Sequence, residues 1–370
     1  MAADSREETD VGTYQETGDD VAQDKGLLER LGDDCEYASG DEDDRQILDE
    51  VQFFRHIREF KKFYPLPKSY YLCVFKANVV IQKKSYRVAG HVFSLSMDGE
   101  DRIWEALGNY EPFIIDGSEE ELFSLELVPE FDIQDKRELY VSNPEPGEQR
   151  IDIHTIEGGY LFELAPLPEM PVCGWLKVSS DFSKGYLKTD SSRVFCVNNA
   201  LMLMYAFKTA GLDTIEIHAS CTVCEGKGFL FLGKSGTGKS THSRLWLKNV
   251  PGAWLLNDDN PVIRIIEGEA RVYGTPWSGK TPCYINDDYP VGAVVRINRA
   301  PHDAIHHMSL VEGFASLYSS SSGLRALKPI ADGLFNTVSS VVQKVPCYMM
   351  DCLPDDEAAL VCSKEVLGNG

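Results

Sequence analysis

The sequence predicts a mixed α/β protein with a partly antiparallel sheet, and three observations predict it. Short β-type runs separated by turn residues fill residues 68–195. Strand and helix patterns alternate from residue 196 onward. Within that second region, EGEA at 267–270 lies between two apolar runs, 262–266 and 271–273, which predicts a β-hairpin where a purely parallel sheet would continue through a helix.

The chain is predicted to comprise an acidic tail over 1–45, a β-rich domain over 46–195 and a third region over 196–370. Residues 1–50 carry 18 acidic and 4 basic residues, a net charge of −14, so only −8 of the total −22 belongs to the remaining 320 residues. Such a tail is typical of solvated, disordered chain. Apolar residues at intervals of three or four predict a short helix over 46–64.

Composition restricts the functional class. A basic face, which nucleic-acid binding needs, is missing from a chain with this acidic balance, so we expect no nucleic-acid partner. No apolar stretch approaches the roughly 18 residues of a membrane span, so no membrane partner is expected. The N-terminus lacks the features of a secretory signal, and the ten cysteines are irregularly spaced, which favours a cytoplasmic protein with reduced thiols.

The informative region begins near residue 197. The pattern predicts a helix over 197–209, strands over 214–219 and 229–232, a helix over 241–249 and a strand at 254–256. Three further helices, over about 309–319, 325–343 and 355–366, and one strand near 347–350 complete the expected elements. The β-rich region before it contains no recognisable catalytic motif.

A phosphate-binding motif lies between the strand at 229–232 and the helix that follows. Residues 233–240 read GKSGTGKS and fit the pattern G-x-x-x-x-G-K-[ST]. Glycines let the backbone approach phosphate oxygens, and successive amides at a helix N-terminus face the anion. The predicted nucleotide-binding residues are Gly233, Lys234, Ser235, Gly236, Thr237, Gly238, Lys239, Ser240 and Thr241. Lys239 would reach the terminal phosphates and the Ser240 hydroxyl would ligate Mg²⁺.

An acidic pair, Asp258 and Asp259, ends the apolar strand at 254–256, about 20 residues downstream. Mg²⁺ prefers carboxylates together with phosphate, and phosphate-loop proteins place a carboxylate at this point. Adjacent strand residues point to opposite faces, so, unless the strand ends there, only one aspartate would face the metal and the other would have a second task. The alternative interpretation is a solvated turn before Pro261.

These segments together resemble the superfamily of HPr kinase/phosphorylase and phosphoenolpyruvate carboxykinase, in particular its small bacterial HPr-kinase-like or carboxykinase-like members. The resemblance covers about residues 196–365. It rests on HAS at 218–220, FLGKSGTGKSTHSRLWL at 231–247, LLNDDNP at 255–261 and YGTPWSGK at 273–280. It implies a P-loop core of that type with a mixed, partly antiparallel sheet, preceded by the β-rich domain. It also implies that His218 and Asp258 handle the proton of an acceptor hydroxyl, while Asp259 helps Ser240 bind the metal.

Lys280, at the end of the segment 274–280, is the fourth predicted catalytic residue. This Gly/Ser-containing loop would close over the phosphates, and Lys280 would neutralise charge that develops during phosphoryl transfer. A structural turn is the alternative there. Arg244 and Arg264 fit exposed helix and strand faces better than phosphate contacts.

The leading hypothesis is therefore an ATP- and Mg²⁺-dependent kinase, with Mn²⁺ as the alternative cation. It would transfer a phosphoryl group to a hydroxyl, such as a serine of a peptide, a protein or a free amino acid. A carboxykinase-like lyase is the first alternative, although the residues that a decarboxylating carboxykinase uses for oxaloacetate are not found. The second alternative is a nucleotide-sensing module without catalysis. The acceptor, the choice among ATP, GTP and pyrophosphate, and the oligomeric state are left open.

Overall fold

A computed structural model describes residues 80–99, 101–117, 119–144, 147–279 and 281–368. The predicted tail over 1–45, the predicted helix over 46–64 and Lys280 lie outside these residues. The described part is a mixed α/β structure with two mixed sheets, as the sequence predicts. Among the described residues, no helix combines the length and the apolar character that crossing a bilayer would require.

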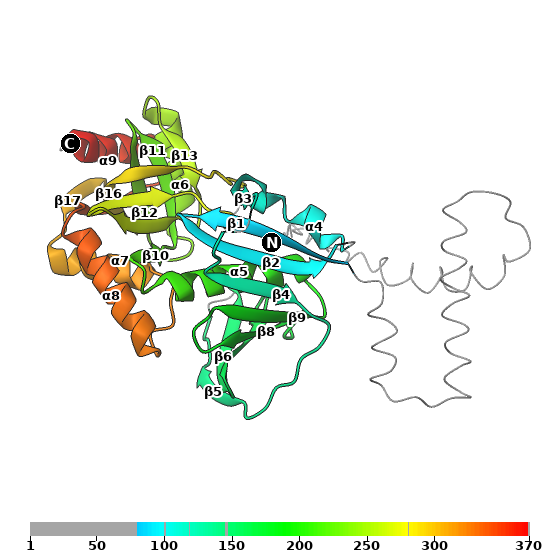
Figure 1. Cartoon of the computed structure of the whole chain (residues 1–370). Coiled ribbons are helices and arrows are strands. Elements are labelled where there is room, and N and C mark those ends of the chain that lie inside the picture. The colour runs from blue at the N-terminus through cyan, green and yellow to red at the C-terminus, as the bar shows by residue number, and fades with distance from the viewer. Residues whose placement is uncertain (1–79, 100, 118, 145–146, 280, 369–370) are drawn as a thin grey trace, which may run out of the picture. The chain divides into compact units, whose positions relative to one another are not determined.

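The first sheet carries the β-rich half of the chain (Figure 1). Its order in the described residues is β3-β1-β2-β4-β9-β8-β7-β6-β5. The β2–β4 and β4–β9 pairs are parallel and the other neighbours are antiparallel. Its strands are β1 (Ile81–Val88), β2 (His91–Asp98), β3 (Ile114–Ile115), β4 (Phe123–Leu127), β5 (Arg137–Tyr140), β6 (Arg150–Ile156), β7 (Gly159–Ala165), β8 (Gly174–Ser179) and β9 (Lys184–Thr189). Two short helices, α4 (Ile103–Ala106) and the 3-10 helix η2 (Gly108–Phe113), connect β2 to β3.

The second sheet holds the predicted phosphate-binding motif. Its main path in the described residues is β10-β14-β15-β16-β12-β11-β13, and β18 pairs with β16 and β17. The β12–β16 and β16–β18 pairs are parallel, whereas the hairpins β11–β12 and β14–β15 are antiparallel. Its strands are β10 (Thr214–Glu216), β11 (Ala219–Cys224), β12 (Lys227–Leu232), β13 (Trp254–Asn257), β14 (Val262–Ile266), β15 (Glu269–Tyr273), β16 (Asp288–Arg299), β17 (Ala304–His307) and β18 (Cys347–Cys352).

Five longer helices pack on these sheets: α5 (Arg193–Thr209), α6 (Lys239–Asn249), α7 (Leu310–Ser320), α8 (Lys328–Val342) and α9 (Asp356–Gly368). Helix α5 contacts β4, β8 and β9 of the first sheet and β10 of the second (Figure 1). Helix α7 begins with a capping box, in which the hydroxyl of Ser309 and the carboxylate of Glu312 bond each other's backbone amides. The three C-terminal helices lie within a few residues of the ranges that the sequence predicts.

One hydrophobic cluster runs through both sheets. It joins Phe93 and Leu125 of the first sheet to Leu201 of α5 and to Val262 and Leu230 of the second. The sequence-predicted boundary between residues 195 and 196 falls inside α5. A second cluster, built around Trp246 of α6, packs α6 and α9 on the other face of β12 and β16. The strand that enters the phosphate-binding motif is therefore buried on both faces.

Candidate functional site

The motif at 233–240 connects β12 to α6 through a loop that only glycine accommodates at three positions. Gly233, Gly236 and Gly238 have φ angles of 157°, 74° and 113°, values that strain residues with a Cβ. A Cβ on Gly233 would also lie 2.4 Å from Oγ1 of Thr237. The Thr237 hydroxyl donates to the carbonyl of Lys234 at 2.7 Å, so the loop is closed by its own hydrogen bonds.

The predicted loop residues differ in exposure. The side chains of Lys234 and Ser235 are exposed, whereas those of Ser240 and Thr241 are half-buried in the first turn of α6. Helix α6 begins at Lys239 without a side-chain cap, directly after Gly238. The free amides of this helix start are the groups that phosphate binding uses.

Lys239 is buried and lies between the loop and His218. Its Nζ donates to the carbonyl of Gly233 at 3.0 Å and lies 2.9 Å from Nε2 of His218. Burial lowers the pKa of Lys239 below its ordinary value, against the opposing charges of Asp259 and Asp258. Because an ammonium group can only donate, Nε2 of His218 accepts, and the imidazole proton of the neutral ring lies on Nδ1.

His218 contacts Asp259 and not Asp258, the aspartate with which the resemblance groups it. Its Nδ1 lies 3.2 Å from Oδ1 of Asp259, and the two side chains are 43% and 33% exposed. The protonated Nδ1 therefore points at a carboxylate, and Lys239, His218 and Asp259 form one continuous chain of contacts. The ring and the carboxylate are both accessible enough to meet a substrate.

Asp258 points in the other direction, into the protein. It is 3% exposed, and its Oδ1 accepts from the hydroxyl of Ser220 at 3.0 Å. Ser220 in turn lies 2.6 Å from the hydroxyl of Ser243, which donates to the carbonyl of Lys239. Oδ2 of Asp258 is buried without a hydrogen-bond partner. An unpartnered buried carboxylate oxygen is costly, and a bound water, an ion or a catalytic role is what explains such an oxygen in a protein.

Asn257 links the acidic pair to the loop at 274–279. Its Oδ1 accepts from the amides of Asp259 and Asn260, both at 2.9 Å, and its Nδ2 donates to the hydroxyl of Thr275 at 3.0 Å. A Cβ on Gly279 would lie 3.2 Å from Cβ of Asp259, so this loop packs closely on the pair. The predicted loop thus lies beside the site.

The loop at 274–279 is also hydrogen-bonded to η2, the short helix between β2 and β3 of the first sheet. The indole of Trp277 donates to the hydroxyl of Tyr110 at 3.0 Å, and Asn109 donates to the carbonyl of Pro276 at 2.9 Å. Both partners belong to η2. The β-rich half therefore supports a loop that borders the acidic pair.

Sequence reasoning missed Glu216, a buried carboxyl two residues before His218. Its Oε1 accepts from the hydroxyl of Ser322 at 3.0 Å, and its Oε2 is buried without a partner. Burial raises the pKa of Glu216 to about 8, and the charge of Asp259 adds to this while the Ser322 bond opposes it. In the predicted strand at 214–219, TIEIHA, Glu216 stands between two isoleucines. An acid in an apolar strand is the sequence feature that could have indicated a buried carboxyl. Ser220 and Ser243, which hold Asp258, carry no comparable signal in the sequence.

The residues around Asp258 suit a hard divalent cation. Among the described residues, no group of three or more His, Cys, Asp or Glu side chains could hold a metal. Mg²⁺ needs no such group, because it is usually bound through one or two carboxylates together with substrate phosphates and water. The unsatisfied Oδ2 of Asp258, close to the start of α6, fits that requirement.

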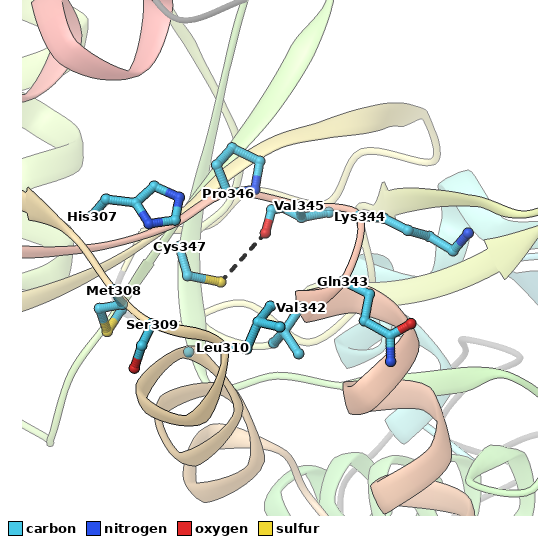
Figure 2. A pocket seen from close by; sticks show the side chains of 11 residues that line it. His307, Met308, Ser309, Leu310, Val342, Gln343, Lys344, Val345, Pro346 and Cys347 are labelled. Carbon is cyan, nitrogen blue, oxygen red and sulfur yellow. Dashed lines mark hydrogen bonds between the residues drawn. The ribbon is translucent and has the colours of Figure 1, made fainter.

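A hollow elsewhere on the second sheet has no part in this arrangement. It has a volume of about 220 Å³ and lies between the start of α7 and the end of α8 (Figure 2). Its walls are residues 307–310, 313 and 342–347. None of the predicted site residues lines it.

Comparisons with known proteins give a remote likeness among solved structures. No protein-family model matches it, and no curated protein matches it. Among solved structures it is similar to the HPr(Ser) kinase/phosphatase from Coxiella burnetii, with 11% identity and a TM-score of 0.26 over 42% of this chain and 94% of that chain. A likeness this remote does not bear on the function of the chain.

Proposed function

We propose that the chain is an ATP- and Mg²⁺-dependent phosphotransferase that transfers the γ-phosphoryl group to a hydroxyl, with a phosphate-loop core of the HPr kinase type. One observation carries the proposal: a glycine-dependent loop ends in Lys239, whose ammonium lies within 3 Å of both the loop and His218. The motif supplies the phosphate cradle, and the neighbouring carboxylates supply the metal ligands and the proton-handling group.

Lys239 changes partner in the proposed reaction. In the structure its ammonium donates to Nε2 of His218. Polyphosphate bound in the loop attracts the ammonium of Lys239 away from His218. The lone pair on Nε2 can then accept a proton. Nε2 then accepts the proton of the acceptor hydroxyl. At the same time the hydroxyl oxygen bonds to the γ-phosphorus, and the bond between the γ-phosphorus and the bridging oxygen of the β-phosphate breaks. Asp259, bonded to Nδ1, orients the ring and stabilises its cationic form.

Asp258 and Ser240 would hold the cation, and Asp259 would add negative charge to the same site. The bound cation would neutralise charge on the phosphoryl oxygens. In this proposal Asp259 orients His218, and Asp258 is the main ligand of the cation. The resemblance implies the opposite roles for the two aspartates. The unpartnered Oδ2 of Asp258 supports the proposed assignment.

The acceptor is proposed to be a serine hydroxyl of a peptide, a protein or a free amino acid, and a cytoplasmic location belongs to the same proposal. The described cysteines are free thiols, including Cys173 and Cys196, whose sulfurs lie 3.5 Å apart in a thiol hydrogen bond and not in a disulfide. Lys280 is proposed as a further phosphate-neutralising cation at the end of the loop that packs on Asp259.

The test is to incubate the full-length protein with γ-labelled ATP, Mg²⁺ and cell extract, and to identify what becomes labelled. We expect Lys239→Ala to abolish labelling. Lys248→Ala, which removes an exposed lysine from the far end of α6 where it pairs with Asp356, should retain it. Labelling that persists in Lys239→Ala overturns the assignment. Formation of phosphoenolpyruvate dependent on oxaloacetate would instead support a lyase, and ATP binding without turnover would support a sensing module.

A further inference from the structure

Arg299, the last residue of β16, reaches the phosphate-binding loop from outside. Strand β16 pairs in parallel with β12, the strand that enters the loop, and Leu232 lies opposite Arg296. Because β16 continues for three residues beyond that point, Arg299 arrives beside the loop. Its Nη2 donates to the carbonyl of Gly236, and its Nε donates to the carbonyl of Thr237 at 3.4 Å.

These two bonds fix the direction of the loop's peptide groups. The described chain has no cis peptide bonds, so each carbonyl points opposite to the N–H of the same peptide unit. With the carbonyls of Gly236 and Thr237 turned toward Arg299, the amides of Thr237 and Gly238 point to the other side. The amide of Thr237 closes the loop by donating to Lys234 at 3.1 Å. The amide of Gly238 therefore points away from Arg299, to the side on which the proposed function places the phosphates.

Glycine makes this external support important. Gly236 and Gly238 flank Thr237, and a glycine peptide has access to more backbone conformations than any other, so the loop gains orientation only from the bonds made to it. The hydroxyl of Thr237 supplies one such bond from inside the loop. Arg299 supplies two from outside, with the planar donor geometry that suits two neighbouring acceptors.

We propose that Arg299 is a positioning residue for nucleotide binding, which holds the carbonyls of Gly236 and Thr237 outward so that the loop amides face the phosphates. The inference rests on the proposed function and adds to it a residue outside the phosphate-loop motif. Arg299 acts through the backbone and not by adding charge, because its side chain is exposed and its field is screened by salt.

The experiment measures the Kd of Mg²⁺–ATP by calorimetry for the full-length wild type, Arg299→Ala, Arg299→Gln and Arg102→Ala, at low and high salt. Arg102, an exposed arginine before α4, is the control for loss of one positive charge. We expect Arg299→Ala to weaken binding on the order of tenfold, the size of a lost charged hydrogen-bonding group. Arg299→Gln keeps a neutral donor, so its affinity should lie between those of the wild type and Arg299→Ala. Arg102→Ala should bind with the affinity of the wild type.

The ratio of the Kd of Arg299→Ala to that of the wild type should not depend on the salt concentration. A roughly tenfold ratio that persists at about 1 M salt, where the Debye length is ~3 Å, supports positioning. A ratio that falls to one at high salt, or Arg299→Ala binding as tightly as wild type, overturns it. Amide hydrogen exchange in the nucleotide-free protein is the second readout, and faster exchange over 233–240 is expected in Arg299→Ala alone. Unchanged exchange there also overturns the inference. A wild-type chain that binds no nucleotide overturns the proposed function instead.

Discussion

Replacing Asp258 by asparagine should make the protein more stable and inactive at once. Asp258 is 3% exposed, and its Oδ2 has no hydrogen-bond partner. An unsatisfied buried polar group costs about 1–3 kcal/mol, and more when it is charged. Asparagine has nearly the same shape and can still accept from Ser220 through Oδ1. Its Nδ2 stays unpaired where Oδ2 was, so the substitution relieves only the part of the cost that comes from burying a charge. We therefore expect Asp258→Asn to raise the free energy of unfolding of the nucleotide-free protein by about 1–2 kcal/mol, or the Tm by roughly 2–4 °C.

Adding ligand should reverse the order of the two proteins. Mg²⁺–ATP at a hundredfold excess over Kd stabilises a protein that binds it by about 2.7 kcal/mol. The variant, having lost a metal-holding carboxylate, should gain much less. Thermal and urea unfolding with and without Mg²⁺–ATP measure both effects. Asp332→Asn, which alters an exposed aspartate paired with Lys328, is the control and should change little in either condition.

Two outcomes would refute this reasoning. If Asp258→Asn is less stable than the wild type without ligand, the orphan oxygen is satisfied in solution and does not mark a cation site. If the variant gains as much stability from Mg²⁺–ATP as the wild type does, Asp258 does not hold the cation. The control separates both outcomes from a general effect of removing one negative charge.

Three further predictions concern the loop and its helix. Lys239→Met, which keeps much of the buried volume, should leave the far-UV circular dichroism spectrum unchanged and abolish phosphoryl transfer; measurable transfer would contradict the role of the ammonium. Gly238→Ala, at a φ of 113°, should cost roughly 1–2 kcal/mol of backbone strain and weaken nucleotide binding. Gly226→Ala, strained in the β11–β12 turn, should lose stability without losing nucleotide affinity, and equal affinity losses would argue against a specific loop geometry. His242 is buried with neither ring nitrogen bonded, and burial lowers its pKa to about 4 from an ordinary value near 6.5. Since the unfolded chain binds the proton first, stability should fall as the pH falls from 6.5 toward 4, by about 2–3 kcal/mol between pH 7 and 4.5. Urea unfolding of His242→Phe should lack this part of the acid sensitivity, whereas a variant of the exposed His306 should retain it.

The sequence predicts most elements of the second sheet but not its central strand. The segment 288–299, which forms β16, contains Pro290 and Gly292, and both residues interrupt a strand pattern. In the structure Pro290 lies where β16 pairs with β15, opposite Arg271. Gly292 is needed because a Cβ there would lie 2.7 Å from the ring of Phe229. Tertiary packing thus explains residues whose local propensity favours a turn. Because the strand was not predicted, the position of Arg299 at its end could not be predicted either.

The contact of His218 with Asp259 depends on how the chain turns after β13. That strand ends at Asn257, so the alternation of a strand does not set the directions of Asp258 and Asp259. Asp259 is held instead by the side chain of Asn257, which accepts from its amide, and by the amide of Ala219, which donates to its carbonyl. The sequence indicates an acidic pair close to His218, but the side-chain bonds that decide which carboxylate contacts the ring are not readable from it.

Helix α5 has a consequence for how the chain can be divided. Cβ atoms added to Gly174 and Gly185 of the first sheet would lie 2.6 Å from Sγ of Cys196 and 2.3 Å from Sδ of Met204, so those strands are shaped around the helix. Tyr205 donates to the carbonyl of Val88 at 3.1 Å, and β10 follows only a few residues later. A gene fragment encoding residues 196–370 alone would yield a polypeptide with this apolar helix uncovered, prone to aggregate during expression. Crystallisation or screening efforts should therefore retain the strands from residue 80 onward.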